Sequence, residues 1–229
     1  MIKRFRLWCA VLGLAAVAGV LSPAAATTAP VPAAMADPVP RVQLRKAVQL
    51  LGVMTEHGAP YEQGVFGTWW DADFDGCDTR AEVLREEAVG ALRVGDGCAI
   101  TGGQWYSWYD DLPVTGDPAR KVVVEHLVPL EEAWASGAYA WDAAKRAAYA
   151  NDLGARATLT AVSAAAHRDK AGRDPAGWLP PYVPARCAYV TDWVITKLRW
   201  GLTVDFAEAV KLTEVAQGCP NMPVLLSER

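Results

Sequence analysis

The sequence has little of several residue types that would place it quickly in a class. It contains three histidines and five cysteines in 229 residues, and no two cysteines stand at Cys-x-x-Cys spacing. This spacing argues against a zinc site built from cysteines. No internal repeat is visible. The formal net charge is −4, so the composition alone does not indicate a protein that binds nucleic acid, because phosphate attraction usually needs a positive surface.

Long apolar runs are also scarce. The run from Leu7 to Leu21 follows three basic residues and precedes two small-residue cleavage sites, which is typical of a secretory signal. It is short for a membrane span and is soon followed by Pro23. We expect residues 1–36 to be a signal peptide and residues 37–229 to be a single secreted, monomeric domain without a membrane anchor. Because the removed part holds three basic residues and no acidic one, the mature charge falls from −4 to −7.

Cysteine usage agrees with export. Removal of the signal peptide leaves Cys77, Cys98, Cys187 and Cys219. An even number of cysteines in an exported chain indicates two disulfides, for which three pairings exist. We expect each cysteine to pair with its neighbour in sequence, as Cys77–Cys98 and Cys187–Cys219.

Hydrophobic periodicity and turn residues outline the rest of the chain. An aromatic strand is expected over residues 102–109, followed by a loop over 113–118. Asp78 or Thr79 can cap a helix that runs through Val83 and Leu84. Further helices are predicted over residues 41–55, 131–153 with a break at 136–137, 187–200 and 205–217.

Residues 121–170 concentrate the reactive side chains. The β-branched run at 122–124 leads into Glu125 and His126, and the apolar run at 158–163 leads into an alanine-rich stretch that carries His167 and Lys170. The pattern predicts a strand, a second strand and a helix, with an acid and two imidazoles at their junctions.

This arrangement resembles the HNH (His-Asn-His) endonucleases, in particular a secreted bacterial branch related to the nuclease domain of the GmrSD restriction enzymes. The string Cys-Asp-Thr-Arg-x-Glu-Val-Leu at 77–84 and the run Asp-Pro-x-x-Trp-Leu-Pro at 174–180 resemble segments that flank the motif in that family. The resemblance implies an α+β fold in which a ββα-metal finger (His-Me finger) over residues 121–170 is embedded among helices.

The resemblance also assigns roles by position. Glu125 and His167 would be metal ligands, and His126 would be the general base that activates water. Lys170 would hold phosphate, and Arg80 would pair with a structural carboxylate or a substrate phosphate. The implied reaction is hydrolysis of phosphodiester bonds in nucleic acid, DNA rather than RNA, with one divalent metal ion, either Mg²⁺ or Mn²⁺, with Zn²⁺ or Ni²⁺ as further options.

Three positions depart from the family pattern. Glu125 stands where Asp is usual, so its reach to a metal differs. His167 stands where Asn is frequent, and an imidazole shifts the metal preference towards Mn²⁺, Ni²⁺ or Zn²⁺. The middle Asn is replaced by Thr158 at the aligned place. Either Asn151 holds the loop that orients the base, or that role is lost.

Residues 71–82 match a calcium-loop spacing formally. Asp78 stands where an aliphatic residue is expected, and no entering helix is indicated, so we expect a solvated acidic turn rather than a calcium site. Two alternatives to a nuclease stay open. One is a non-catalytic extracellular binding module stabilised by calcium, and the other is a metal hydrolase acting on a non-nucleic substrate.

Overall fold

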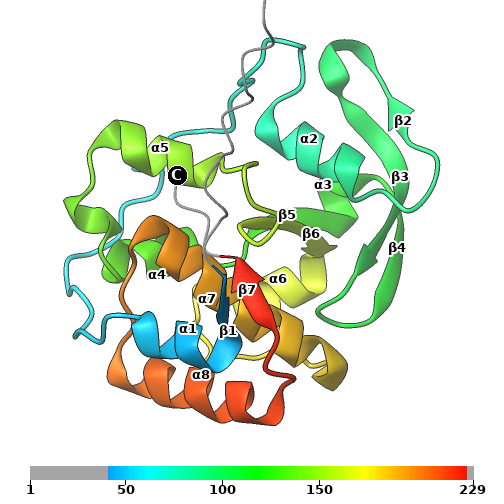
Figure 1. Cartoon of the computed structure of the whole chain (residues 1–229). Coiled ribbons are helices and arrows are strands. Elements are labelled where there is room, and N and C mark those ends of the chain that lie inside the picture. The colour runs from blue at the N-terminus through cyan, green and yellow to red at the C-terminus, as the bar shows by residue number, and fades with distance from the viewer. Residues whose placement is uncertain (1–40, 226–229) are drawn as a thin grey trace, which may run out of the picture. The chain divides into compact units, whose positions relative to one another are not determined.

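A computed structural model of the chain describes residues 41–225 (Figure 1). The described residues belong to one compact unit, and the predicted signal peptide at 1–36 lies outside them. The described strands form three antiparallel sheets, with orders β1-β7, β2-β3-β4 and β5-β6. Their bounds are β1 Arg41–Gln43, β2 Arg93–Val94, β3 Ile100–Ser107, β4 Leu112–Gly116, β5 Val122–His126, β6 Leu159–Ser163 and β7 Pro223–Leu225.

Residues 41–225 also form eight α-helices. The chain therefore mixes helix and sheet, as the α+β prediction required. The bounds are α1 Leu44–Leu50, α2 Thr79–Glu86, α3 Pro118–Lys121, α4 Leu130–Ala135, α5 Ala143–Ala150, α6 Ala164–Lys170, α7 Arg186–Trp200 and α8 Phe206–Gly218.

Strands β5 and β6 pair in the register Glu125 to Thr160 and His126 to Leu159. The chain then passes directly into α6, because the Ser163 side chain caps the helix by accepting a hydrogen bond from the Ala166 amide at 3.0 Å. The predicted order of strand, strand and helix across residues 122–170 is therefore confirmed.

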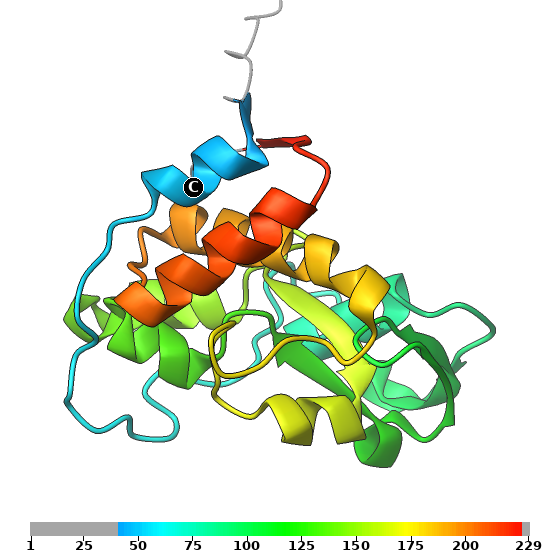
Figure 2. The same cartoon turned by 90° about the horizontal axis from the view of Figure 1, so that it is seen from below.

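The β5–β6 pair is buried on both faces. Alternate residues of the two strands pack against α2 and β3 in a small apolar cluster, and the opposite face meets a larger cluster built around α7. Helices α1, α7 and α8 contact one another within this larger cluster (Figure 2). Burial on both faces explains why the strands read as nearly continuous apolar runs. It also means that any charged residue on them needs an internal partner.

The prediction of a helix over residues 41–55 is wrong at both ends. Residues 41–43 form β1, which pairs with β7 near the other end of the described chain, and α1 ends at Leu50. Apolar spacing in the sequence could not reveal this, because the hydrogen-bond partner of β1 lies about 180 residues away in the sequence.

The predicted loop over residues 113–118 is also wrong in part, because residues 112–116 form β4 and pair with β3. Pro113 is tolerated there because β4 is an edge strand. The prediction of a strand over 102–109 is confirmed by β3, which places Trp105 in the core.

The predicted helix over 131–153 is found as α4 and α5, with a break after Ala135. The predicted C-terminal helices are found as α7 and α8, and Asp78 is the residue that caps α2. Among residues 41–225, no helix combines the length and the apolar composition needed to cross a membrane.

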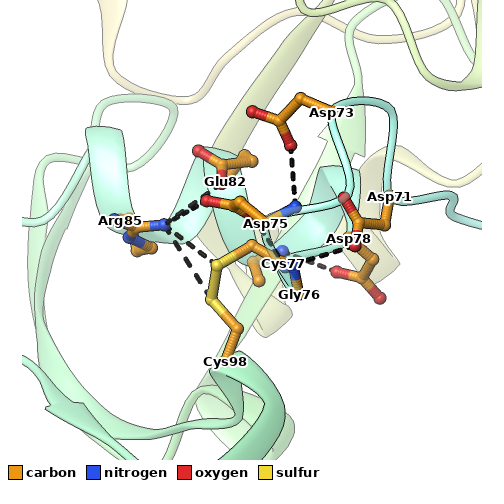
Figure 3. Close-up of a disulfide and its surroundings, with 10 residues drawn as sticks. Asp71, Asp73, Asp75, Gly76, Cys77, Asp78, Glu82, Arg85 and Cys98 are labelled. Carbon is orange, nitrogen blue, oxygen red and sulfur yellow. Dashed lines mark hydrogen bonds and ion pairs between the residues drawn. A yellow bond between two sulfur atoms is a disulfide. The ribbon is translucent and has the colours of Figure 1, made fainter.

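Both predicted disulfides are present. Cys77 pairs with Cys98 at a Cα separation of 5.0 Å, and Cys187 pairs with Cys219 at 5.6 Å. The first joins the acidic loop before α2 to the turn before β3 (Figure 3). The second joins the start of α7 to the end of α8. Closing loops of this size stabilises a fold by about 3 kcal/mol each.

Candidate active site

Glu125 is the charged residue of the doubly buried β5–β6 pair, and its side chain is only 2 % exposed. Two residues of α6 meet its carboxylate. The His167 Nδ1 atom contacts Oε2, and the Lys170 ammonium contacts Oε1. His167 and Lys170 lie three positions apart on one helix, so they share a face. The antiparallel hairpin and the helix that follows it thus bring together residues 42 and 45 positions apart in sequence.

The electrostatics of this cluster favour an ionised carboxylate. Burial raises the pKa of Glu125, but the Lys170 charge and the hydrogen bonds from His167 and Lys170 outweigh it, so the pKa lies below its usual value. The pKa of Lys170 is also lowered, since burial outweighs the attraction of Glu125. Lys170 is 0 % exposed and also donates to the His126 carbonyl at 3.2 Å.

His126, the last residue of β5, is held by its ring. Its Nε2 atom lies 2.9 Å from the Ala150 carbonyl oxygen. A carbonyl only accepts, so Nε2 carries the proton in the neutral ring and Nδ1 has the free lone pair. Burial lowers the pKa of His126 to about 4, against the opposing effects of the Ala150 hydrogen bond and the Glu125 charge. The imidazole is therefore neutral near pH 7, as a general base must be.

An indole covers one face of this imidazole. The Trp69 and His126 rings are stacked, with centroids 5.1 Å apart and planes 4° from parallel. Tyr149 adds a second ring contact, with its centroid 6.0 Å from that of the imidazole. Trp69 and the Ala150 carbonyl were not among the sequence-predicted site residues. Sequence carries no signal for either contact, because both join segments that are distant along the chain.

Asn151 is 5 % exposed and binds the segment that carries Trp69. Its Oδ1 accepts from the Trp70 amide at 3.0 Å, and its Nδ2 donates to the Thr68 carbonyl at 3.1 Å. Thr158, which stands at the aligned place of the family's middle Asn, instead donates to Asp152 at 3.0 Å. The structure therefore joins Asn151, and not Thr158, to the neighbours of Trp69.

The remaining predicted residues lie as follows. Arg80 is the second residue of α2 and half-buried, and within residues 41–225 its side chain makes no hydrogen bond or ion pair with another described residue. The Lys170 ammonium contacts the Glu125 carboxylate, and the lysine side chain is buried and does not face the solvent. The third histidine, His57, is exposed and stacks on Tyr139 with ring centroids 3.8 Å apart.

Glu125 and His167 bring one carboxylate oxygen and one imidazole nitrogen into direct contact through a hydrogen bond, so a cation held by both would take the place of the proton between them. An oxygen donor beside an imidazole nitrogen is a ligand pair that Mn²⁺ and Zn²⁺ would accept. In the described part of the chain, groups of three possible ligands lie elsewhere: Glu56 with Asp174 and Asp205, Asp71 with Asp73 and Asp75, and Asp75 with Cys77 and Glu82.

Carboxylates of the acidic loop at 71–76 accept hydrogen bonds from backbone amides within and next to the loop (Figure 3). Asp71 accepts from the Gly76 amide at 2.9 Å, and Asp75 accepts from the Cys77 amide at 2.8 Å. Arg85 lies 3.6 Å from the Asp75 carboxylate. These contacts are those of a tight polar turn closed by the Cys77–Cys98 disulfide.

Comparison with known proteins identifies the class. Residues 94–215 match the family described as "GmrSD restriction endonucleases, C-terminal domain". The match covers more than half of the chain and includes Glu125, His126, Asn151, His167 and Lys170. The chain therefore belongs to this family and carries a nuclease-family domain, as the resemblance implied.

A relative from the fungus Arthroderma benhamiae, named "Uncharacterized secreted protein", is 36 % identical over 143 residues, which are 62 % of this chain and 68 % of the relative. No solved structure matches the chain. The secreted relative and the two disulfides confirm the prediction of a secreted protein. Because this relative is fungal, the placement in a bacterial branch is not confirmed.

Proposed function

We propose that the protein is a secreted endonuclease of the HNH type that uses one divalent metal ion to hydrolyse phosphodiester bonds, in DNA rather than RNA. The observation that carries this proposal is the direct contact of Glu125 with His167, beside an imidazole that is neutral at physiological pH. In this reading β5, β6 and α6 are the ββα-metal finger.

Glu125 and His167 would hold the metal ion. A bound divalent metal supplies neutralisation of phosphate charge and assistance to the leaving oxygen. Lys170 acts within the protein by keeping the Glu125 carboxylate ionised and fixed in position, since its ammonium is enclosed against it. Arg80, with its side chain unpaired among the described residues, is available for a substrate phosphate.

His126 is the general base. Its Nδ1 lone pair takes a proton from water as the water oxygen bonds to phosphorus and the bond from phosphorus to the leaving sugar oxygen breaks. The Ala150 carbonyl sets which nitrogen carries the resting proton. The base is therefore oriented by a backbone carbonyl, a group whose charge does not change during the reaction.

The test compares the three histidines of the sequence, using supercoiled plasmid with Mn²⁺ or Mg²⁺. His126→Ala should lower the cleavage rate by about 10²- to 10⁴-fold and keep Mn²⁺ binding in calorimetry. His167→Ala should lose Mn²⁺ binding as well as cleavage. His57→Ala is the matched control and should cut like the wild type, because its exposed ring stacks on Tyr139.

Two results would contradict the proposal. Cleavage at full rate by His126→Ala would overturn the assignment of the base. A wild-type protein that cuts neither DNA nor RNA with any of the four candidate metals would overturn the nuclease function. In that case, screening of non-nucleic phosphoesters would test the metal-hydrolase alternative.

The calcium-stabilised binding module is the second candidate, and the specific observation behind it is that Asp71, Asp73 and Asp75 bring possible ligand atoms within 4.8 Å of one another. Calorimetry with Ca²⁺ and Mn²⁺ on the wild type and His167→Ala distinguishes the two functions. Heat from Ca²⁺ in both proteins, with no Mn²⁺ binding and no cleavage, would favour the module.

A further inference from the structure

The plane of the His126 imidazole is set by contacts from two separate segments. One is the Ala150 carbonyl, which lies 2.9 Å from Nε2 and fixes one point on the ring edge. The other is the indole of Trp69, which lies nearly parallel to the imidazole, at 4°. A single hydrogen bond leaves a ring free to tilt about the bonded nitrogen. A parallel aromatic surface removes that freedom.

The Trp69 indole can perform this role only if its own backbone is fixed, and the structure fixes it on both sides. Asn151 bonds the Thr68 carbonyl and the Trp70 amide. On the other side, the Thr79 amide and hydroxyl both donate to the Trp70 carbonyl, at 2.9 and 3.1 Å. Thr79 is 1 % exposed and opens α2, which packs against the β5–β6 pair.

Both supports of His126 depend on the C-terminal end of α5. Ala150 ends α5 and Asn151 follows it, so adjacent residues supply the carbonyl that holds the imidazole edge and the amide that holds the Trp69 segment. The imidazole, the indole and the end of α5 therefore form one connected unit. Displacement of the indole leaves the Ala150 hydrogen bond in place but removes the restraint on ring tilt.

We infer that Trp69 is a positioning residue, which holds the imidazole plane of His126 so that the Nδ1 lone pair meets the attacking water. The inference rests on the proposed function of His126 as the base. Among the described residues, Trp69 has no recorded side-chain hydrogen bond or ring contact with either proposed metal ligand, and its recorded ring contact is with His126, so its effect should fall on the rate of the chemical step rather than on metal or substrate binding.

The experiment compares Trp69→Leu, Trp69→Phe and the control Trp70→Leu. Trp70 is the adjacent indole, 41 % exposed, and only its backbone is used by Asn151 and Thr79. With plasmid and Mn²⁺, Trp69→Leu should lower kcat by about 10- to 100-fold, because a misplacement of about 1 Å can cost a factor of 10². KM and the Mn²⁺ affinity should stay at wild-type values. Trp69→Phe should recover most of kcat, and Trp70→Leu should behave as wild type.

A second readout does not depend on activity. In the wild type the indole ring current should shift the His126 ring protons upfield in an NMR spectrum, and Trp69→Leu should lose this contribution while keeping that of Tyr149. Wild-type kcat in Trp69→Leu, or a loss that appears in KM instead, would overturn the inference. If the wild type proves to cut no nucleic acid, the proposed function fails by itself. Unchanged His126 shifts in Trp69→Leu would then refute the positioning role separately.

Discussion

Two lysines in residues 41–225 are completely enclosed, and their surroundings differ in what else meets their carboxylate partners. Lys170 on α6 pairs with Glu125, and Lys197 on α7 pairs with Glu132 and Glu208. Both ammonium groups face the same ring, that of Trp193, at 6.0 and 5.5 Å from its centroid. Both lysines therefore lie against the same indole, and both pair with glutamate side chains.

The difference lies in what else meets the carboxylates. Glu125 also contacts His167, whose side chain is 41 % exposed, so the Lys170 pair connects to the solvent through an imidazole. The partners of Lys197 are 5 % and 0 % exposed, and its further contacts are Ser136 and the Thr203 carbonyl. The first carboxylate therefore has a solvent-exposed neighbour, whereas the recorded partners of the other two are buried. The proposed metal site rests on this difference in exposure.

The largest expected effect is that of Lys197→Met. The change leaves the enclosed carboxyl groups of Glu132 and Glu208 without a cation, where burial already raises the pKa of Glu208 to about 8. Breaking a buried ion pair costs about 3–5 kcal/mol of the free energy of unfolding. The melting temperature should fall by about 10 °C, with no recovery on adding Mn²⁺. Thermal unfolding followed by circular dichroism measures this. Lys211→Met, which breaks the exposed pair with Glu214, is the control and should cost less than about 1 kcal/mol.

Lys170→Met should have a smaller effect on stability and a different response to metal. One carboxylate rather than two is left, and His167 stays beside it, so we expect a loss of about 2–3 kcal/mol without metal. Saturating Mn²⁺ should raise the melting temperature of this variant more than that of the wild type, because the ion supplies the missing positive charge to Glu125. An equal rise in melting temperature on adding Mn²⁺ to the Lys170→Met and Lys197→Met variants would contradict the difference between the two sites.

The smallest expected effect of Lys197→Met is on the pH profile, which should be the same as that of the wild type. Burial lowers the pKa of His126 from 6.5 to about 4. In the proposed mechanism the neutral ring is the base, so activity should be complete well above this pKa and should be lost as the pH falls through about 4. The profile of kcat/KM at saturating Mn²⁺ should therefore have its acid limb near pH 4 in the wild type and in Lys197→Met alike. An acid limb near 6.5 would mean that the imidazole is solvated in the working enzyme.

The sequence was sufficient for features that depend on local pattern. The β-branched run before Glu125 predicted β5, and the residues after Ser163 predicted α6, because strand and cap signals lie within a few positions of the elements they define. Disulfide pairing by nearest neighbours was also correct. The acid and the imidazole that meet in the structure were picked out by the resemblance to the HNH endonucleases, and the β5–β6 pairing followed by α6 brings them together.

Other features depend on contacts that no local pattern records. The burial of Lys170 follows from how α6 packs against β5, and a lysine on a short helix reads in sequence as solvated. The network of Lys197 joins residues 65 and 11 positions away. The stack of Trp69 on His126 joins a loop residue to the end of β5, which only the complete fold brings together, so no local pattern marks Trp69 as a site residue.

The connection between β5 and β6 has a consequence for engineering. Residues 127–158 leave the hairpin, build α4 and α5, and return with the carbonyl and the amide that support the imidazole and its indole neighbour. A transplant limited to the two strands and α6 would carry the acid and both histidines but leave the base without its supports. A transplanted site would need residues 68–70 and Thr79 as well as residues 122–170.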